Sequence, residues 1–353
     1  MTCLKYFIFT LFIVTASFIS PALSESQPPN VLIRPSIVVT IKPIYGLVAA
    51  ITDGVLTPTL LCDKGGSSTH TLSLAPSDIR TLSEAHLVIW VGSSYETMMA
   101  RALQKAIPAD QLVTLEQAPG LQKYVQRTGG LFSGGCSQCC DHDHAEGQGA
   151  VLHIHSHAHS HEHGSVDGHF WLDIDNAKCC ARFIEKTLSA KYPAHKDIFA
   201  ANLVKLENAL NAFKIELLAT LAPIRNQIAL IDHDSLYYME KQFGFTIKGV
   251  LSEEPEMPPS PKHLQKLKSE LAVNSDEKLI KVFFFNGERS KMAHPLLQKL
   301  ATEYQIPLAS LSYEGDDLPK AIDTYEACLR HIAMQLLNGF RCVQNSLVQK
   351  PIS

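Results

Sequence analysis

The chain lacks three features that would place it in common functional classes. Its formal net charge is −4, so nothing indicates the strongly basic face that nucleic acid binding needs. Beyond the N-terminus, no apolar run approaches the roughly 20 residues of a membrane span. No His-Glu-x-x-His helix, which carries the zinc of many proteases, is present. We therefore expect no nucleic acid partner, no stable membrane insertion and no enzyme activity.

The N-terminus is typical of a secretory signal. Lys5 supplies the positive charge, and an apolar run of residues 6–19 follows. Ala22 and Ser24 occupy the −3 and −1 positions of a cleavage site. The run is too short for a transmembrane anchor, and no cysteine follows the cleavage site to carry a lipid. We expect residues 1–24 to be removed and the mature protein to reside in a periplasm.

Histidine is what the chain has in excess. Nine of its 16 histidines fall within residues 142–169, and in the middle of that stretch they alternate with other residues. Because neutral imidazole is a strong ligand for zinc, we interpret residues 133–166 as a metal-collecting loop rather than a polar insertion without function. Cys136, Cys139 and Cys140 are either soft ligands or a disulfide. The auxiliary ligands that we predict are His142, His144, His153, His155, His157, His159, His161 and His163.

Short β-branched runs alternate with helical stretches along the chain, which predicts parallel sheets covered on both faces. A helix over 195–222 has its apolar residues at steps of three and four, which indicates one buried stripe. The stripe comprises Leu203, Leu206, Leu210, Phe213, Leu217 and Leu221. We predict strands at 36–41, 56–61, 87–91, 112–115, 228–231, 245–250, 279–285 and 307–311. We predict further helices at 44–51, 76–82 (capped by Ser77 or Asp78), 176–189, 235–243, 261–271, 295–304 and 320–337.

The predicted fold class is therefore α/β, with two similar parallel-sheet lobes joined by one long helix. The N-terminal α/β domain covers residues 25–192 and includes the histidine-rich loop. The linking helix covers 193–223, and the C-terminal α/β domain covers 224–353.

Three histidines, His70, His169 and His233, lie after predicted strands or at the end of the histidine-rich stretch. His70 follows the second strand by way of a glycine turn, and His233 follows the strand 228–231 directly. His169 lies where the histidine-rich stretch ends. Ligands of open α/β sheets bind outside the carboxyl ends of the strands, so the three side chains are candidates for one metal site.

The segments around these histidines resemble the periplasmic zinc-uptake solute-binding proteins of ABC transporters, the ZnuA type. The resemblance covers nearly the whole mature chain, and the motifs occur in the family's order. It rests on the segments 41–44 (IKPI), 65–78 (GGSSTHTLSLAPSD), 85–92 (AHLVIWVG), 168–173 (GHFWLD), 233–244 (HDSLYYMEKQFG) and 255–261 (PEMPPSP).

The resemblance implies a receptor that binds Zn²⁺ in a cleft between the lobes and delivers it to a membrane permease, working as a monomer. His70, His169 and His233 match the family's first, second and third ligands, and an all-imidazole set suits zinc. Where relatives have an aspartate as a fourth ligand, Ser312 stands here. Glu314 and Asp316 are therefore candidate additional ligands, with water, Asp317 or a histidine of the loop as alternatives.

Two other features bear on that reading. Some relatives have a strand–helix disulfide, for which Cys328 fits the helix partner, but Lys281 stands at the strand position. Three histidines also describe a catalytic zinc, and a periplasmic zinc buffer would share the binding chemistry. A zinc buffer or chaperone and, less favoured, a zinc-dependent hydrolase are therefore the alternative functions.

Overall fold

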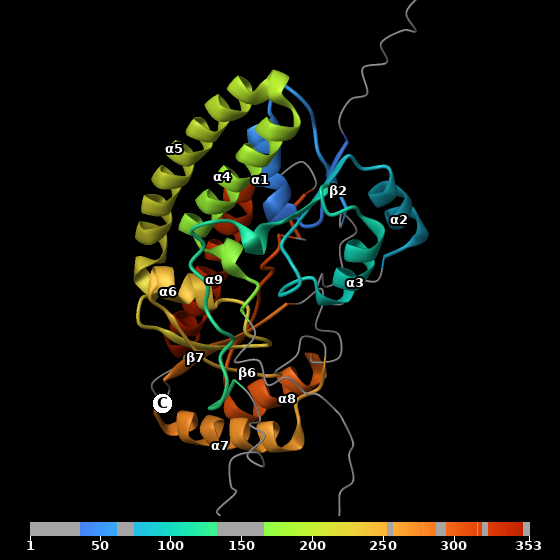
Figure 1. The fold of residues 1–353 in the computed structure, drawn as a ribbon. Helices are drawn as coiled ribbons and strands as arrows, with labels where there is room; N and C mark the ends of the chain where they lie inside the picture. The colour runs from blue at the N-terminus through green and yellow to red at the C-terminus, as the bar shows by residue number, and fades with distance from the viewer. Residues whose placement is uncertain are drawn as a thin grey trace, which may run out of the picture. The chain divides into compact units, whose positions relative to one another are not determined.

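Two four-stranded parallel sheets, one in each lobe, organise the protein (Figure 1). Their strand orders, β2-β1-β3-β4 and β6-β5-β7-β8, are the same when each lobe is numbered from its own first strand. The predicted α/β fold with two parallel-sheet lobes is thus confirmed. The strands are β1 (Ile37–Val39), β2 (Thr59–Leu60), β3 (Leu87–Trp90), β4 (Leu112–Thr114), β5 (Ile228–Ile231), β6 (Thr246–Val250), β7 (Ile280–Phe285) and β8 (Leu308–Ser310).

The structure is a computed structural model. No helix of its described part is both long and apolar enough to cross a bilayer. The predicted signal, residues 1–24, lies outside the described residues. The residues described are 36–61, 74–132, 166–252, 257–277, 279–286, 294–315, 317–319 and 324–348.

Most helices lie where the sequence predicts them, although the helices predicted at 261–271 and 320–337 end later, at Glu277 and Val348. Three further departures have local causes. α3 was not predicted, because only Met99 and Leu103 of its residues are buried and its apolar stripe is short. The last helix begins after Thr324, whose hydroxyl accepts a hydrogen bond from the Ala327 N–H at 3.2 Å, and so starts later than expected. α2 is preceded by Ala75, whose N–H donates to the Asp78 carboxylate, so Asp78 stabilises the first turn from inside the helix. The helices are α1 (Lys42–Thr52), α2 (Pro76–Ser83), α3 (Thr97–Ala106), α4 (Ile174–Lys191), α5 (Lys196–Leu221), α6 (Tyr237–Phe243), α7 (Pro261–Glu277), α8 (His294–Tyr304) and α9 (Tyr325–Val348).

Alternate residues of each strand face different helices, which explains why the strands are apolar throughout. In the first lobe, Val38 and Trp90 pack with residues of α2 and α3, whereas Val39 and Ile89 join the main core. In the second lobe, Leu230 and Phe283 pack with residues of α7 and α8, whereas their strand neighbours join the main core. Both sheets are therefore covered on both faces.

The main core continues from one lobe into the other through a shared layer of helices. α5 packs on α1, α4 and α9, and α9 also packs on β7 and β8. The stripe predicted on α5 is buried at five of its six positions, and the sixth, Leu203, is partly buried. Residues 35–353 consequently form one compact unit, and the domain boundaries inside it remain a prediction.

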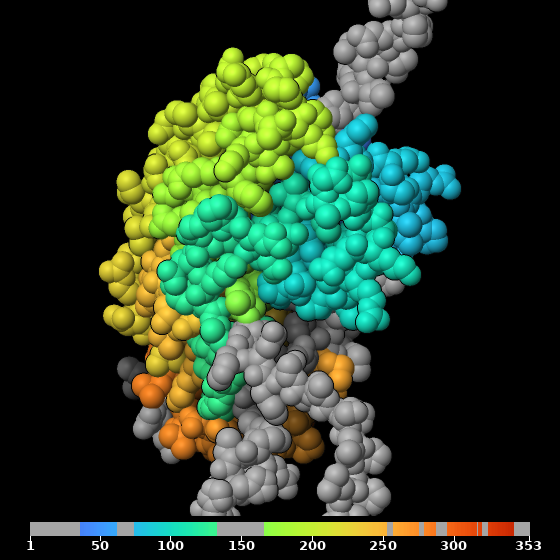
Figure 2. All heavy atoms as spheres, viewed as in Figure 1, coloured from blue at the N-terminus to red at the C-terminus, as the bar shows by residue number. Residues whose placement is uncertain are grey.

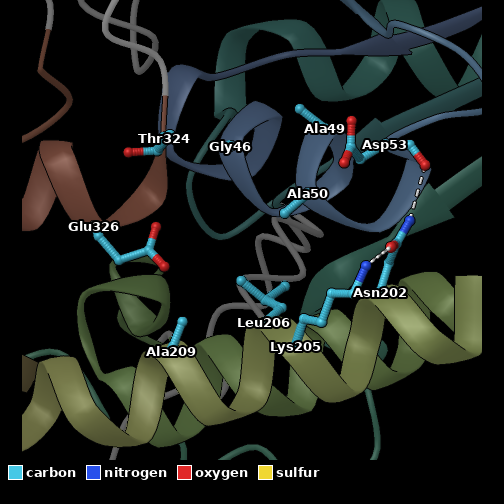
Figure 3. A pocket seen from close by; sticks show the side chains of 10 residues that line it. All are labelled: Gly46, Ala49, Ala50, Asp53, Asn202, Lys205, Leu206, Ala209, Thr324 and Glu326. Atoms are coloured by element: carbon cyan, nitrogen blue, oxygen red, sulfur yellow. Dashed lines mark hydrogen bonds between the residues drawn. The ribbon is translucent and has the colours of Figure 1, made fainter.

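Asn202 of α5 ties that helix to the end of α1. Its side-chain N–H groups donate to the carbonyl groups of Ile51 at 3.0 Å and Asp53 at 2.9 Å. A surface pocket of about 410 Å³ opens beside this contact, between α1, α5 and the start of α9 (Figure 3). None of its lining residues is a predicted metal ligand. They are Gly46, Ala49, Ala50, Asp53, Asn202, Lys205, Leu206, Ala209, Thr324 and Glu326.

Glu96 closes the turn that follows β3 with a buried carboxylate. Its Oε2 atom accepts hydrogen bonds from the N–H groups of Val91 at 2.8 Å and Gly92 at 3.3 Å. Desolvation by burial raises the pKa of Glu96 from 4.5 to about 7, although the backbone hydrogen bonds oppose the shift.

Glu96→Gln should flatten the dependence of stability on pH. Because the folded-state pKa lies above the unfolded value, ionisation of Glu96 lowers the free energy of unfolding as the pH rises from 4.5 to about 7. The loss should be no more than about 3 kcal/mol, and the neutral amide avoids it. Urea unfolding at pH 5 and pH 8 measures the change, with Glu84→Gln on the surface as the control. Equal pH slopes for the wild type and Glu96→Gln would contradict the assignment.

Candidate metal centre

His233 lies at the carboxyl end of the central strand β5, in the turn that leads to α6. The N–H group of Asp232 donates to the Phe284 carbonyl of β7 at 3.0 Å, which keeps the turn on the sheet. The Asp232 carboxylate in turn accepts from the Asn286 N–H at 2.8 Å. Its other oxygen contacts the His233 N–H at 2.9 Å and the Nδ1 atom at 3.2 Å. Asp232 therefore orients the imidazole, which is 5% exposed.

His169 is oriented by a second carboxylate in the same way. Asp167 Oδ1 lies 2.9 Å from the backbone nitrogen of His169 and 2.8 Å from its Nδ1 atom. Gly168, between them, must be glycine, because a Cβ atom there would lie 2.7 Å from the Ser94 carbonyl carbon. When a carboxylate holds Nδ1–H, the imidazole presents Nε2 as its metal-binding nitrogen. Each ring has its Nδ1 atom directed at a carboxylate, so a metal held by either histidine would be bound through Nε2.

The two imidazoles lie together although they come from different lobes. Their ring centroids are 5.8 Å apart. Two imidazoles on one tetrahedral zinc, with Zn–N bonds of 2.0–2.1 Å, have ring centroids about 5 Å apart. The observed separation is close to this value, so the rings could share one ion after a small adjustment.

Aromatic rings surround the histidine pair. The Tyr313 ring centroid lies 4.9 Å from that of His233 and 6.1 Å from that of His169, edge-on in both cases. The Tyr95 ring lies 5.0 Å from His169, also edge-on. Because all four residues are at most 5% exposed, the pair lies in a largely dry environment in which metal–ligand electrostatics are strong.

Glu314 is the predicted additional ligand that the structure describes. It is 2% exposed, and its carboxylate accepts a hydrogen bond from the hydroxyl group of Tyr95 across the lobes. Asp317, in contrast, bonds to His331 Nε2 at 2.7 Å and to Gln335 Nε2 at 2.9 Å. The described ranges contain no group of three His, Cys, Asp or Glu side chains arranged to hold a metal.

Several predicted ligands lie outside the described residues. His70 belongs to the segment 62–73, and Asp316 is also not described. The eight auxiliary histidines and the cysteines Cys136, Cys139 and Cys140 fall in the segment 133–165. The structure therefore brings together two of the three predicted principal ligands, and the place of His70 stays a prediction.

Lys42 fastens the loop that carries Tyr313 and Glu314. This lysine begins α1 in the first lobe, and it is 9% exposed. Its ammonium group donates to the carbonyls of Gly315 at 3.3 Å, Leu318 at 3.1 Å and Pro319 at 3.4 Å in the second lobe. Such charge-assisted bonds are stronger than neutral ones. Lys42 therefore links the lobes directly beside the histidine pair.

The sequence matches the family model ZnuA, described as zinc-uptake complex component A, periplasmic, over residues 37–339. The chain belongs to the ZnuA family. The relative named high-affinity zinc uptake system protein ZnuA from Brucella abortus (strain 2308) is 36% identical over 249 residues, which cover 66% of this chain and 72% of that protein. Its counterpart from Yersinia pestis is 30% identical over 256 residues, which cover 72% of this chain and 77% of that protein.

Solved structures share the fold of this ZnuA-family chain. A crystal structure of ZnuA aligns with a TM-score of 0.64 at 19% identity, covering 86% of this chain and 98% of that one. The periplasmic zinc binding protein TroA from Treponema pallidum aligns with a TM-score of 0.65 at 17% identity, covering 87% and 99%. The resemblance noted from the sequence motifs is thereby confirmed at the level of family and fold.

The sequence predicts that Asp232 and Asp234, which flank His233, either cap a helix or orient its imidazole, but it does not indicate the other residues that support the two histidines. Lys42 occurs in the IKPI segment, but nothing local indicates that its ammonium group reaches the second lobe. Tyr95 and Tyr313 have no spacing motif, and they reach the site through contacts between distant segments. For Asp167 a useful signal was available, because it lies two residues before His169.

Lys42→Met should lower the free energy of unfolding by roughly 1–3 kcal/mol, because it leaves buried carbonyl groups without their charged donor. Urea unfolding of the metal-free protein measures the change. Lys105→Met is the matched control, since Lys105 is an exposed lysine at the end of α3. An equal effect of the two substitutions would contradict the role assigned to Lys42.

Proposed function

We propose that this chain is a periplasmic receptor that binds Zn²⁺ between its two lobes and delivers it to the membrane permease of an ABC transporter. The observation that carries the proposal is the pair formed by His169 and His233, whose ring centroids are 5.8 Å apart and whose Nδ1 atoms both contact carboxylates. Membership of the ZnuA family supports zinc as the ion, as do the names of its relatives, which are zinc uptake proteins.

Zinc binding would use His70, His169 and His233 as principal ligands. Neutral imidazole nitrogen suits zinc, and three nitrogens leave one position of a tetrahedron for a further ligand. Glu314 and Asp316 remain candidates for that position, and so does water. Asp167 and Asp232 would keep the ligating imidazoles in the correct tautomer and raise their basicity.

We expect the zinc to enter and leave without large movements of the lobes, because the two lobes share one core. The main core, α5 and α9 extend across both lobes, and Lys42 and Tyr95 add polar contacts near the site. We infer that metal exchange involves local changes around the histidines, and that the loaded monomer docks on the permease. The histidine-rich stretch 133–166 would raise the local zinc concentration through many weak ligands.

Removal of any one principal imidazole should weaken zinc binding strongly. Loss of an outer-shell partner typically lowers metal affinity 10–100-fold, so loss of a ligand in His70→Ala, His169→Ala or His233→Ala should cost more than about 100-fold. Competition titration with a chromophoric chelator measures the zinc dissociation constant. His195→Ala is the control, because that histidine packs against Phe199 at the start of α5. Wild-type affinity in His233→Ala would refute the proposed site.

Deletion of residues 133–164 should lower the number of zinc ions bound while one tight site remains. The deleted segment holds the eight auxiliary histidines, whereas His70, His169 and His233 are retained. Calorimetric titration with zinc gives both the stoichiometry and the affinity. Disappearance of all tight binding would show that the stretch is part of the principal site, contrary to the proposal.

A zinc buffer and a zinc-dependent hydrolase are distinguished from the receptor by function. Zinc transport by vesicles that contain the cognate permease and ATPase should depend on addition of the protein. A buffer would bind zinc without stimulating transport, and a hydrolase would turn over an activated ester in a zinc-dependent way.

A further inference from the structure

A segment of the first lobe extends onto the second. Residues 121–132 follow β4 and η1 (Leu115–Gln117), and Leu131 forms a parallel bridge with Gly249 of β6. The N–H group of Val250 donates to the Leu131 carbonyl at 2.9 Å. Figure 2 shows the green end of this segment lying against the orange surface of the second lobe. The segment therefore brings side chains of the first lobe to the turn that follows β5.

Arg127 is the charged side chain of this segment that engages that turn. Its Nε atom donates to Asp234 Oδ2 at 2.8 Å, and Nη2 donates to the other oxygen of Asp234. Nη1 donates to Glu240 Oε2 of α6 at 2.7 Å. The guanidinium carbon lies 4.0 Å from the ring centroid of Phe132 and 4.3 Å from that of Tyr237. The fork of hydrogen bonds to Asp234 fixes both the position and the plane of that carboxylate.

Asp234 is the residue directly after His233. On the other side of the histidine, the Asp232 N–H donates to the Phe284 carbonyl of β7, and the Asp232 carboxylate contacts the imidazole Nδ1. The turn is thus fastened at both neighbours of His233, by the sheet at Asp232 and by Arg127 at Asp234. Only the second fastening comes from the other lobe.

We propose that Arg127 is a positioning residue for zinc binding, which acts through Asp234 to hold His233 against His169. This role rests on the proposed function, because it requires His233 to be a zinc ligand. Arg127 does not touch the metal, and a lysine could not replace its bidentate contact. The alternative is that Arg127 only ties the lobes together and that its loss affects stability alone.

The two carboxylate partners of Arg127 allow these possibilities to be separated. Asp234 adjoins His233, whereas Glu240 lies six residues further along the chain, on α6. The variants are Arg127→Met, Asp234→Asn, their double mutant and Glu240→Gln as the matched control. Zinc affinity is measured by chelator competition, the ligand geometry by the visible absorption of the Co²⁺-loaded protein, and stability by the thermal midpoint of the metal-free protein.

Arg127→Met and Asp234→Asn should each lower zinc affinity by about 10–100-fold and alter the Co²⁺ absorption. The double mutant should lose no more zinc affinity than the single mutant with the larger loss, because both substitutions remove the same interaction. Glu240→Gln should lower the thermal midpoint while zinc affinity stays within about twofold of the wild type, because the residue next to His233 remains held. Arg127→Lys, which keeps the charge but loses the fork, should retain the fold and still bind zinc more weakly.

Two results would overturn the positioning role. One is wild-type zinc affinity and Co²⁺ absorption in Arg127→Lys and Asp234→Asn. The other is an equal loss of affinity in Glu240→Gln and Asp234→Asn, which would indicate a general structural effect. Arg127→Lys covers the case in which Arg127→Met does not fold. If His233→Ala itself bound zinc normally, the proposed function would fail, and that outcome is distinguishable from a failure confined to Arg127.

Discussion

The contact between His169 and His233 depends on keeping two sheets with their carboxyl ends opposed. In each sheet the first strand lies between the second and the third, and in sheets of this order ligands bind outside the carboxyl ends of the strands. His233 follows β5, the first strand of the second sheet, directly. His169 lies just before α4, which packs in the core of the first lobe. The candidate metal centre therefore depends on how the two parallel sheets face one another.

Buried and partly buried charged and polar side chains stabilise this arrangement. Lys42 and Arg127 extend from the first lobe to acceptors in the second, and Tyr95 reaches Glu314. A buried charge is costly unless it is paired and hydrogen-bonded, so each group specifies one relative placement of the lobes. Apolar packing through α5 and α9 supplies the bulk of the shared core. The polar contacts fix how the two lobes are placed relative to each other beside the histidine pair.

The sequence was informative wherever structure is determined by near neighbours. Apolar runs predicted seven of the strands closely, and β2 is shorter than expected because only Thr59 and Leu60 pair with β1. The stripe on α5 was read correctly because its period is that of the helix. α3 was missed because a helix with only two buried residues has a weak periodic pattern. Helix ends were less accurate, because they depend on single hydrogen bonds such as the one at Thr324.

By itself, the sequence determined which segments form strands and helices, and which histidines follow them with a carboxylate within two residues. These features are local, since they depend on backbone propensity, on periodic burial and on side chains that reach their own main chain. The tertiary structure alone decided that His169 meets His233, that Tyr95 and Tyr313 flank the pair, and that Arg127 holds the turn after β5. Arg127 and Asp234 are 107 residues apart, and such a contact leaves no period or spacing in the sequence. Burial and pairing between distant residues arise only when the folded chain brings their surfaces together, which is why the candidate ligands and the carboxylates beside His233 could be listed in advance but the supports from distant segments could not.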